Sequence, residues 1–212
     1  MSDSNAVATT GVTLAVIAAI CTGLVAGTYH LTGRRIAENE RAWLEQSLAP
    51  ALSGVFFDGS VTESKVVLEP PHELPGSEAA VIYRVYSEGR PVAALFLVTA
   101  RDGYAGPIRI LVGVRIDGTV TGVRIVAHRE TPGLGDRIDQ SRSDWVYQFD
   151  GRSLADPDPG GWALEVDGGE FDQLTGASVT PRAVIKAIRE TLLYFDAHRE
   201  EIFTLPATED PT

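Results

Sequence analysis

The sequence predicts an α+β fold, with a single N-terminal transmembrane helix followed by a mainly antiparallel β-sheet domain flanked by helices. Three observations lead to this prediction. Residues 4–33 contain no Asp, Glu, Lys or Arg, a series of apolar β-type runs fills the middle of the chain, and an amphipathic segment closes it. The expected parts are a tail and transmembrane helix (1–33), a stalk helix and linker (34–60), the soluble domain (61–205) and a flexible tail (206–212).

The N-terminal apolar run is long enough to cross a bilayer. As a helix, residues 11–31 would rise about 31 Å, which matches the thickness of the hydrocarbon core. A signal peptide would carry positive charge before the run and a small-residue cleavage site after it, but only Asp3 precedes this run and the cleavage signal is poor. A retained transmembrane helix is therefore predicted.

Charges beside this helix predict its orientation. Arg34, Arg35 and Arg41 follow the run, and no Lys or Arg precedes it. By the positive-inside rule alone, the C-terminal domain would lie in the cytoplasm.

The stalk is predicted as an amphipathic helix over residues 36–51. Its apolar side chains recur near the helical period of 3.6 residues. They are Ile36, Trp43, Leu44, Leu48 and Ala51.

The soluble domain is predicted to consist of antiparallel strands closed by a helix. After a proline-containing loop at 70–75, apolar and β-branched runs predict strands at 80–87, 91–99, 108–116 and 119–126, and residues 162–166 predict one more. Short Gly-containing turns separate neighbouring runs, as in hairpins. A stripe at helical spacing predicts a helix over 181–203. The stripe comprises Ala183, Val184, Ala187, Ile188, Leu192 and Phe195.

Composition excludes several classes of function. A net charge of −11 disfavours nucleic-acid binding, because the phosphate backbone would be repelled. The single cysteine, Cys21, excludes an intrachain disulfide, a cysteine-based zinc site and an iron–sulfur cluster. The histidines are scattered, and the sequence lacks Walker A, G-x-G-x-x-G, G-x-S-x-G and H-E-x-x-H motifs. We therefore predict neither a metal site nor a catalytic constellation.

A hydroxyl-rich turn precedes the closing helix. Thr175, Ser178 and Thr180 surround the small residues Gly176 and Ala177. Thr180 is predicted as the helix N-cap, with the following proline as the first helical residue. The spacing alone is explained by a helix start, but backbone N–H groups at the positive end of a helix also favour a phosphate.

A second segment follows a predicted strand directly. Residues 128–136 contain a Pro-Gly pair, whose glycine is Gly133, flanked by Glu130, Thr131 and Leu134. The simplest interpretation is a turn, and its glycines also allow the backbone to approach a flat ligand closely.

Together, these segments resemble the FMN-binding domain shared by the G subunit of the Rnf (Rsx) electron-transport complex and the C subunit of the sodium-pumping NADH:quinone reductase. The family's E-T-P-G-L-G segment stands at 130–135, and its flavinylation motif D-x-x-[ST]-G-A-[TS] stands at 172–178. A third family segment, G-Y-A-G-P-I, stands at 103–108, and the single N-terminal helix matches too. The continuation T-P-R-A-V at 180–184 is more similar to the Rnf protein of this pair.

The resemblance implies FMN linked through its phosphate to a hydroxyl side chain by a magnesium-dependent flavin transferase. Where the family usually has Thr, this chain has Ser178, which can form the same phosphoester. Ser178 is therefore the expected attachment site, Thr180 is the alternative, and loss of the flavin is a third possibility. The expected cofactor-binding residues are Ser178, Thr180, Thr175, Gly176, Ala177, Glu130, Thr131, Gly133 and Leu134, with the ring against the 131–135 turn and Arg182 near the phosphate.

The resemblance further implies an electron-transfer subunit rather than a stand-alone enzyme, relaying electrons between ferredoxin and NAD partners and coupled to ion translocation. The implied partners are other membrane and peripheral subunits, the flavin transferase and membrane lipid, with no nucleic acid. The family places this domain on the periplasmic face of the inner membrane, against the positive-inside count, and we adopt the family's placement. The alternatives are a structural or assembly subunit with a degenerate flavin site and a tethered binding module.

Overall fold

The computed structural model describes residues 11, 14–19, 21–23, 48, 50–58 and 60–208 of the chain. Most of the expected transmembrane segment 11–31 and of the stalk helix 36–51 lies outside these residues. Within the described residues, no helix is long and apolar enough to cross a membrane. The chain divides into two compact units, Met1–Leu44 and Glu45–Thr212, and the second contains the soluble domain.

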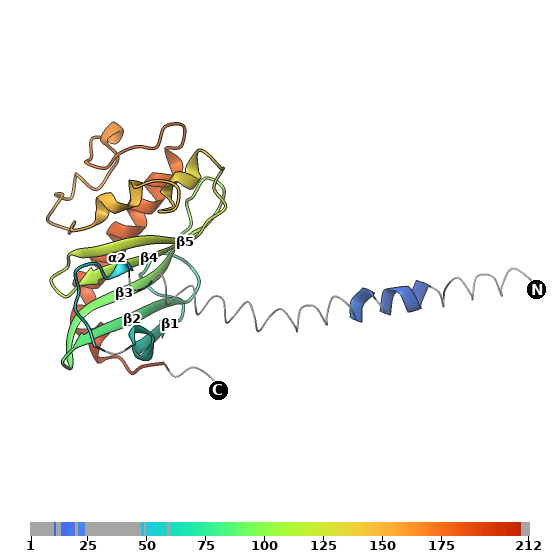
Figure 1. The fold of residues 1–212 in the computed structure, drawn as a ribbon, viewed down its shortest axis with the longest axis horizontal. Coiled ribbons are helices and arrows are strands. Elements are labelled where there is room, and N and C mark those ends of the chain that lie inside the picture. The colour runs from blue at the N-terminus through green and yellow to red at the C-terminus, as the bar shows by residue number, and fades with distance from the viewer. Residues whose placement is uncertain are drawn as a thin grey trace, which may run out of the picture. The chain divides into compact units, whose positions relative to one another are not determined.

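A five-stranded antiparallel sheet forms the centre of the second unit, with the strands adjacent in chain order (Figure 1). The strands are β1 (Lys65–Leu68), β2 (Ala80–Ser87), β3 (Arg90–Ala100), β4 (Ile108–Arg115) and β5 (Val120–Ala127). Between β2 and β3, Glu88 and Gly89 both have positive φ, at 50° and 73°. A two-residue hairpin loop of this kind matches the right-handed twist of its strands. Such short connections produce the simple up-and-down order.

The strands predicted at 80–87, 91–99, 108–116 and 119–126 are confirmed as β2 to β5, with ends shifted by at most one residue. The predicted strand at 162–166 is wrong. There, Leu164 forms only an isolated bridge with Phe171, and Glu165–Asp167 forms the 3-10 helix η4. Trp162 packs in an aromatic cluster with Phe149 and Phe171 and Leu164 lies in the core, but Val166 is 60% exposed, so this segment packs as a loop and not as a strand of the sheet.

The closing helix α2 (Val179–Thr204) lies against one face of the sheet (Figure 1). It begins two residues before the predicted 181–203 helix. The predicted apolar stripe is buried in the core. At its centre, the ring of Phe195 meets that of Phe96 from β3 edge-on, with centroids 6.0 Å apart. The stripe therefore fixes α2 across the strands. In the described part of the chain α2 is the long helix that flanks the sheet.

The segment around residue 51 packs against the opposite face of the sheet. Gly113 of β4 and Gly122 of β5 lie opposite each other in the antiparallel register. Ala51 is 0% exposed and lies directly over them, since a Cβ on Gly113 would meet the Ala51 carbonyl oxygen at 2.3 Å. The hydroxyl of Thr121 donates to that same oxygen at 2.6 Å. We call Gly113 and Gly122 the glycine notch, because the missing side chains admit the backbone of Ala51.

Candidate functional site

Two β-turns of the same kind lie at the start of α2 and after β5. In the first, the amide of Ala177 donates to the carbonyl of Leu174 at 2.9 Å, and Gly176 has φ 81°. In the second, the amide of Leu134 donates to the carbonyl of Thr131 at 3.1 Å, and Gly133 has φ 79°. Turns with positive φ at the third position favour glycine there. The glycines of the two motifs therefore have a local structural reason.

The two turns touch each other. A Cβ on Gly176 would lie 3.0 Å from Cδ2 of Leu134, so the side chain of the second turn packs against the backbone of the first. This contact joins segments about forty residues apart in the sequence and leaves the hydroxyl-rich turn beside the Pro-Gly turn.

The first turn is also held from behind by the 3-10 helix η3 (Trp145–Phe149). The indole N–H of Trp145 donates to the carbonyl of Asp172 at 2.6 Å, and the side-chain oxygen of Gln148 accepts from the amide of Asp172 at 2.8 Å. Trp145 in turn packs on Phe149, with ring centroids 5.3 Å apart. The aromatic cluster therefore anchors the start of the 172–178 segment.

Between the turns lies a cavity of about 390 Å³. It is lined by Tyr104, Glu130, Thr131, Leu134, Gly135, Gly176, Ala177, Ser178, Val179 and Thr180. Pockets of a few hundred cubic ångströms are typical of small-molecule and cofactor sites. The exposed side chains of Tyr104 and Leu134 form apolar parts of its rim. The three sequence segments with family resemblance therefore meet at one cavity.

Glu130 joins the walls of this cavity. It is 5% exposed, its Oε1 accepts from the amide of Ala105 at 3.0 Å, and its Oε2 accepts from the hydroxyl of Thr180 at 2.6 Å. Gly135 makes room for this pair, because a Cβ there would lie 2.6 Å from Oε2 of Glu130 and 2.9 Å from the Thr180 hydroxyl oxygen. One carboxylate thus connects the loop after β3 with the first turn of α2.

The assignment of Thr180 as the helix N-cap is wrong. The N-cap of α2 is Ser178, and Thr180 is the second helical residue. The physical reason is a long-range bond: the Thr180 hydroxyl is committed to Glu130 and is 1% exposed. The Ser178 side chain is exposed and forms no capping hydrogen bond, so within the part of the chain that the structure describes its hydroxyl is free at the edge of the cavity.

Arg182, expected near a phosphate, lies next to Ser178 and is paired with a carboxylate. Its Nη1 is 3.5 Å from the Ser178 carbonyl oxygen, and its Nε and Nη2 lie 2.5 and 2.8 Å from the two oxygens of Asp167. This hydrogen-bonded guanidinium holds the pKa of Asp167 below its ordinary value and raises the pKa of Arg182. The fork of Arg182 is therefore fixed close to the hydroxyl-rich turn.

Most of the residues predicted from the motifs line this cavity. Those that do are Glu130, Thr131, Leu134, Gly176, Ala177, Ser178 and Thr180. Thr175 and Gly133 belong to the two turns but do not line the cavity. Tyr104, Gly135 and Val179 line it and were not predicted individually. The G-Y-A-G-P-I and E-T-P-G-L-G segments contained the signal for the first two.

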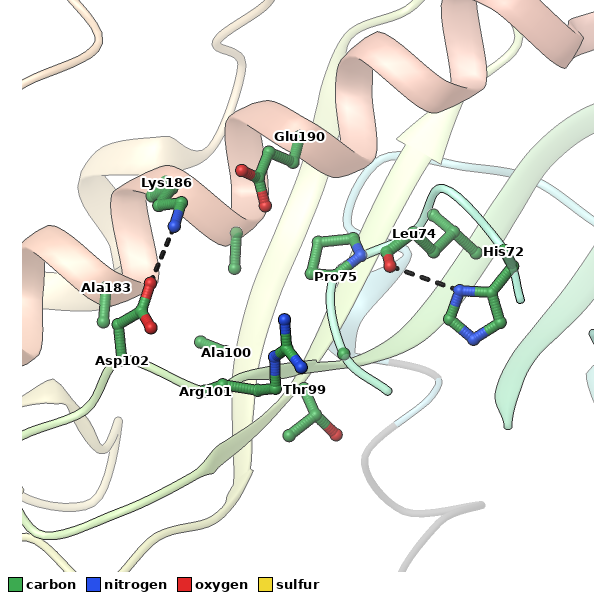
Figure 2. Close-up of a pocket in the computed structure, with 12 residues that line it drawn as sticks. His72, Leu74, Pro75, Thr99, Ala100, Arg101, Asp102, Ala183, Lys186 and Glu190 are labelled. Atoms are coloured by element: carbon green, nitrogen blue, oxygen red, sulfur yellow. Dashed lines mark hydrogen bonds and ion pairs between the residues drawn. The ribbon is translucent and has the colours of Figure 1, made fainter. Parts of the chain in front are cut away.

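A second cavity, of about 290 Å³, lies further along α2, between that helix, the end of β3 and the loop at 72–76 (Figure 2). Nζ of Lys186 is 2.7 Å from a carboxylate oxygen of Asp102, which lowers the pKa of Asp102 and raises that of Lys186. Figure 2 shows the Arg101 side chain directed into the cavity between Pro75 and Glu190. Since cations and anions balance on this lining, the charges select no ligand.

Comparisons with known proteins point to one family. A family model described as the FMN-binding domain matches residues 103–193, and one described as the RnfG N-terminal region matches residues 1–50. The G subunit of the ion-translocating oxidoreductase complex of Pseudomonas aeruginosa (strain UCBPP-PA14) is 44% identical over 189 residues, which cover 89% of this chain and 88% of that protein. The corresponding protein of Shewanella baltica (strain OS223) is 41% identical over 196 residues, or 92% of each chain. Among solved structures, Shewanella oneidensis NqrC is similar at 22% identity and a TM-score of 0.43, covering 68% of this chain and 70% of that one.

Proposed function

Since this chain belongs to the family of G subunits of ion-translocating oxidoreductase complexes and contains its FMN-binding domain, we propose that it carries FMN as a covalent phosphoester on Ser178. In this proposal it is a membrane-anchored electron-transfer subunit. The main supporting observation is the free hydroxyl of Ser178, which lies at a cavity built from the family's own motifs.

The surroundings of the three hydroxyls in the motif favour Ser178. Thr180 is buried and its hydroxyl donates to Glu130, so a transferase cannot reach it in the folded chain. Thr175 is exposed but lies outside the cavity lining. Ser178 is both exposed and part of the lining. An acceptor has to be accessible to an enzyme and also place the cofactor in its site, and Ser178 meets both conditions.

The phosphate would lie in a favourable field. Ser178 is the N-cap of a 26-residue helix, where free backbone N–H groups and the helix dipole favour negative charge. Arg182 holds its guanidinium beside the same residue. Charge-assisted bonds from an arginine fork suit phosphate oxygens. These groups would bind and orient a phosphate dianion on the Ser178 oxygen.

The cavity fits part of a flat cofactor. Leu134 and the ring of Tyr104, which are 42% and 73% exposed, would cover apolar parts of an isoalloxazine ring, while the backbone of the 131–135 turn approaches its edge. Bound FMN would supply the electron-transfer chemistry, and the protein would set its position and surroundings. An intact cavity with both motifs in contact favours this function over a structural or assembly subunit with a degenerate flavin site.

The proposed assembly follows from the family. A subunit of an ion-translocating oxidoreductase complex works beside other membrane and peripheral subunits, and we propose that electrons pass between ferredoxin and NAD partners. A flavin transferase would load the FMN. The apolar run at 11–31 would anchor the chain in the inner membrane lipid with the flavin domain in the periplasm.

Replacement of Ser178 tests the attachment site. With a flavin transferase co-expressed, we expect Ser178→Ala to abolish the ultraviolet fluorescence of the denatured chain in a gel, because among Thr175, Ser178 and Thr180 only Ser178 is both exposed and part of the cavity lining. Ser178→Thr, which keeps the hydroxyl, should retain fluorescence, and so should Thr180→Val. Peptide mass mapping should place the FMN on the peptide 172–182 in the wild type.

Covalent flavin in the Ser178→Ala variant would move the site to another hydroxyl. A wild-type chain without flavin, beside a transferase shown to be active on a known acceptor, would refute the electron-carrier proposal. The structural or assembly role would then remain.

A further inference from the structure

We propose that the carboxylate of Glu130 lowers the reduction potential of the flavin, acting as a buried negative charge in the cavity wall. This inference rests on the proposed function, because it assumes that FMN occupies the cavity between the two turns. It assigns to Glu130 a role beyond lining the site.

Glu130 is a carboxylate without a cationic partner. Its two oxygens accept one backbone and one hydroxyl hydrogen bond, from Ala105 and Thr180. In the described part of the chain no Lys, Arg or His side chain forms an ion pair with it. Neutral donors stabilise a carboxylate but leave its net charge in place, so the field of this group reaches into the cavity.

The surrounding backbone is shaped to admit this charge. A Cβ on Gly135 would lie 2.6 Å from one oxygen of Glu130, and a Cβ on Gly103 would lie 3.0 Å from the other. Burying a charge is costly unless hydrogen bonds compensate it. A neutral amide could make both of the same bonds, with its carbonyl accepting from Ala105 and its NH₂ donating to the Thr180 hydroxyl. The hydrogen-bonding role alone therefore does not require a charged side chain.

The direction of the effect follows from Coulomb's law. Reduction adds negative charge to the flavin, and a fixed negative charge nearby raises the free energy of the reduced form. In a site of low effective dielectric constant, such an interaction is several times stronger than in water. Glu130 should thus make the flavin a stronger reductant, and removing its charge should move the potential in the positive direction.

The test is potentiometric titration, at pH 8, of the full chain purified in detergent with its FMN attached. Glu130→Gln keeps the shape and both hydrogen bonds, and we expect its midpoint potential to be more positive than that of the wild type. Glu190→Gln is the matched control, since it removes the same charge from the second cavity on α2. Its potential should stay at the wild-type value.

Thr180→Val is a second test variant, to be used if Glu130→Gln does not fold or does not retain flavin. It deletes a neutral donor, leaves the charge less compensated, and should move the potential in the negative direction. Equal potentials in the wild type and in flavin-loaded Glu130→Gln would overturn this inference alone, as would an unchanged or more positive potential in Thr180→Val. A wild-type chain that takes up no flavin would instead refute the proposed function.

Discussion

At the scale of single residues, the surroundings of a side chain decide its role more than its chemical type does. Ser178 and Thr180 are both hydroxyls at the start of α2, yet one is exposed and free and the other is buried against Glu130. The local sequence predicted a cap at Thr180, because its position before a proline is typical of helix starts. Its real partner is fifty residues away, and no local pattern contains that information.

The ion pair between Asp167 and Arg182 makes stability depend on pH. The pKa of Asp167 is lowered in the folded chain, so its ionised form adds stability above its ordinary pKa of 3.8, and this stability is lost as the pH falls through the lowered value. We expect Asp167→Asn to melt below the wild type at pH 7, and the difference to disappear only as the pH falls through the lowered pKa of Asp167, below 3.8. Because the pair is partly exposed, the difference should be small and should shrink further in salt.

Thermal unfolding across pH measures this effect. Asp144→Asn is a suitable control, because the Asp144 side chain forms no hydrogen bond or ion pair in the described part of the chain. A constant difference between Asp167→Asn and the wild type from pH 7 to pH 3 would contradict the assignment.

At the scale of elements, the sequence predicted the sheet well where strands are long and separated by glycine turns. The strand β1 was missed because Lys65–Leu68 has only four residues, too few for an alternating pattern to stand out. The strand expected at 162–166 does not form, because tertiary packing overrides the strand-like composition of these residues. Its Trp162 packs against Phe149 and Phe171, in an aromatic cluster that also contains Trp145.

The glycine notch joins the sheet to the segment before it, and its packing can be tested. A Cβ on Gly113 would meet the Ala51 carbonyl oxygen and the Thr121 hydroxyl oxygen, each at 2.3 Å. We expect Gly113→Ala to destabilise the full chain by about 1–3 kcal/mol, the usual cost of overpacking a core. Gly160→Ala should change stability little, since its nearest neighbour is an exposed side-chain oxygen at 3.3 Å.

Thermal melting in detergent compares the two variants. Equal melting temperatures for Gly113→Ala and the wild type would mean that the Ala51 backbone can leave the notch without cost. We expect such a displacement of Ala51 to be costly, because Arg124 donates to the carbonyl of the neighbouring Pro50 at 2.7 Å and holds the same segment in place.

At the scale of the whole molecule, two sequence signals give opposite topologies. Arg34, Arg35 and Arg41 favour a cytoplasmic domain by the positive-inside rule, whereas the proposed function places the flavin domain in the periplasm. Few charges contribute to the rule here, and partner subunits can determine orientation.

We expect alkaline phosphatase fused to the C-terminus to be active, because that enzyme matures only outside the cytoplasm. Green fluorescent protein at the same position should be dark. The same phosphatase fusion lacking residues 1–33 is the control and should be inactive, because the expected anchor is removed. A bright fluorescent fusion together with an inactive phosphatase would show that the soluble domain lies in the cytoplasm, as Arg34, Arg35 and Arg41 predict by the positive-inside rule.

The concealment of Thr180 also imposes an order on how the mature protein is made. Its hydroxyl is withheld by burial and by its hydrogen bond to Glu130, and both exist only once α2 and the segment after β5 have come together. An unfolded chain would present Ser178 and Thr180 alike, two residues apart, to any modifying enzyme. If FMN is attached at Ser178 as proposed, loading at that residue alone would be favoured when folding is finished before the flavin arrives, and the tertiary structure would then serve as a checkpoint for maturation.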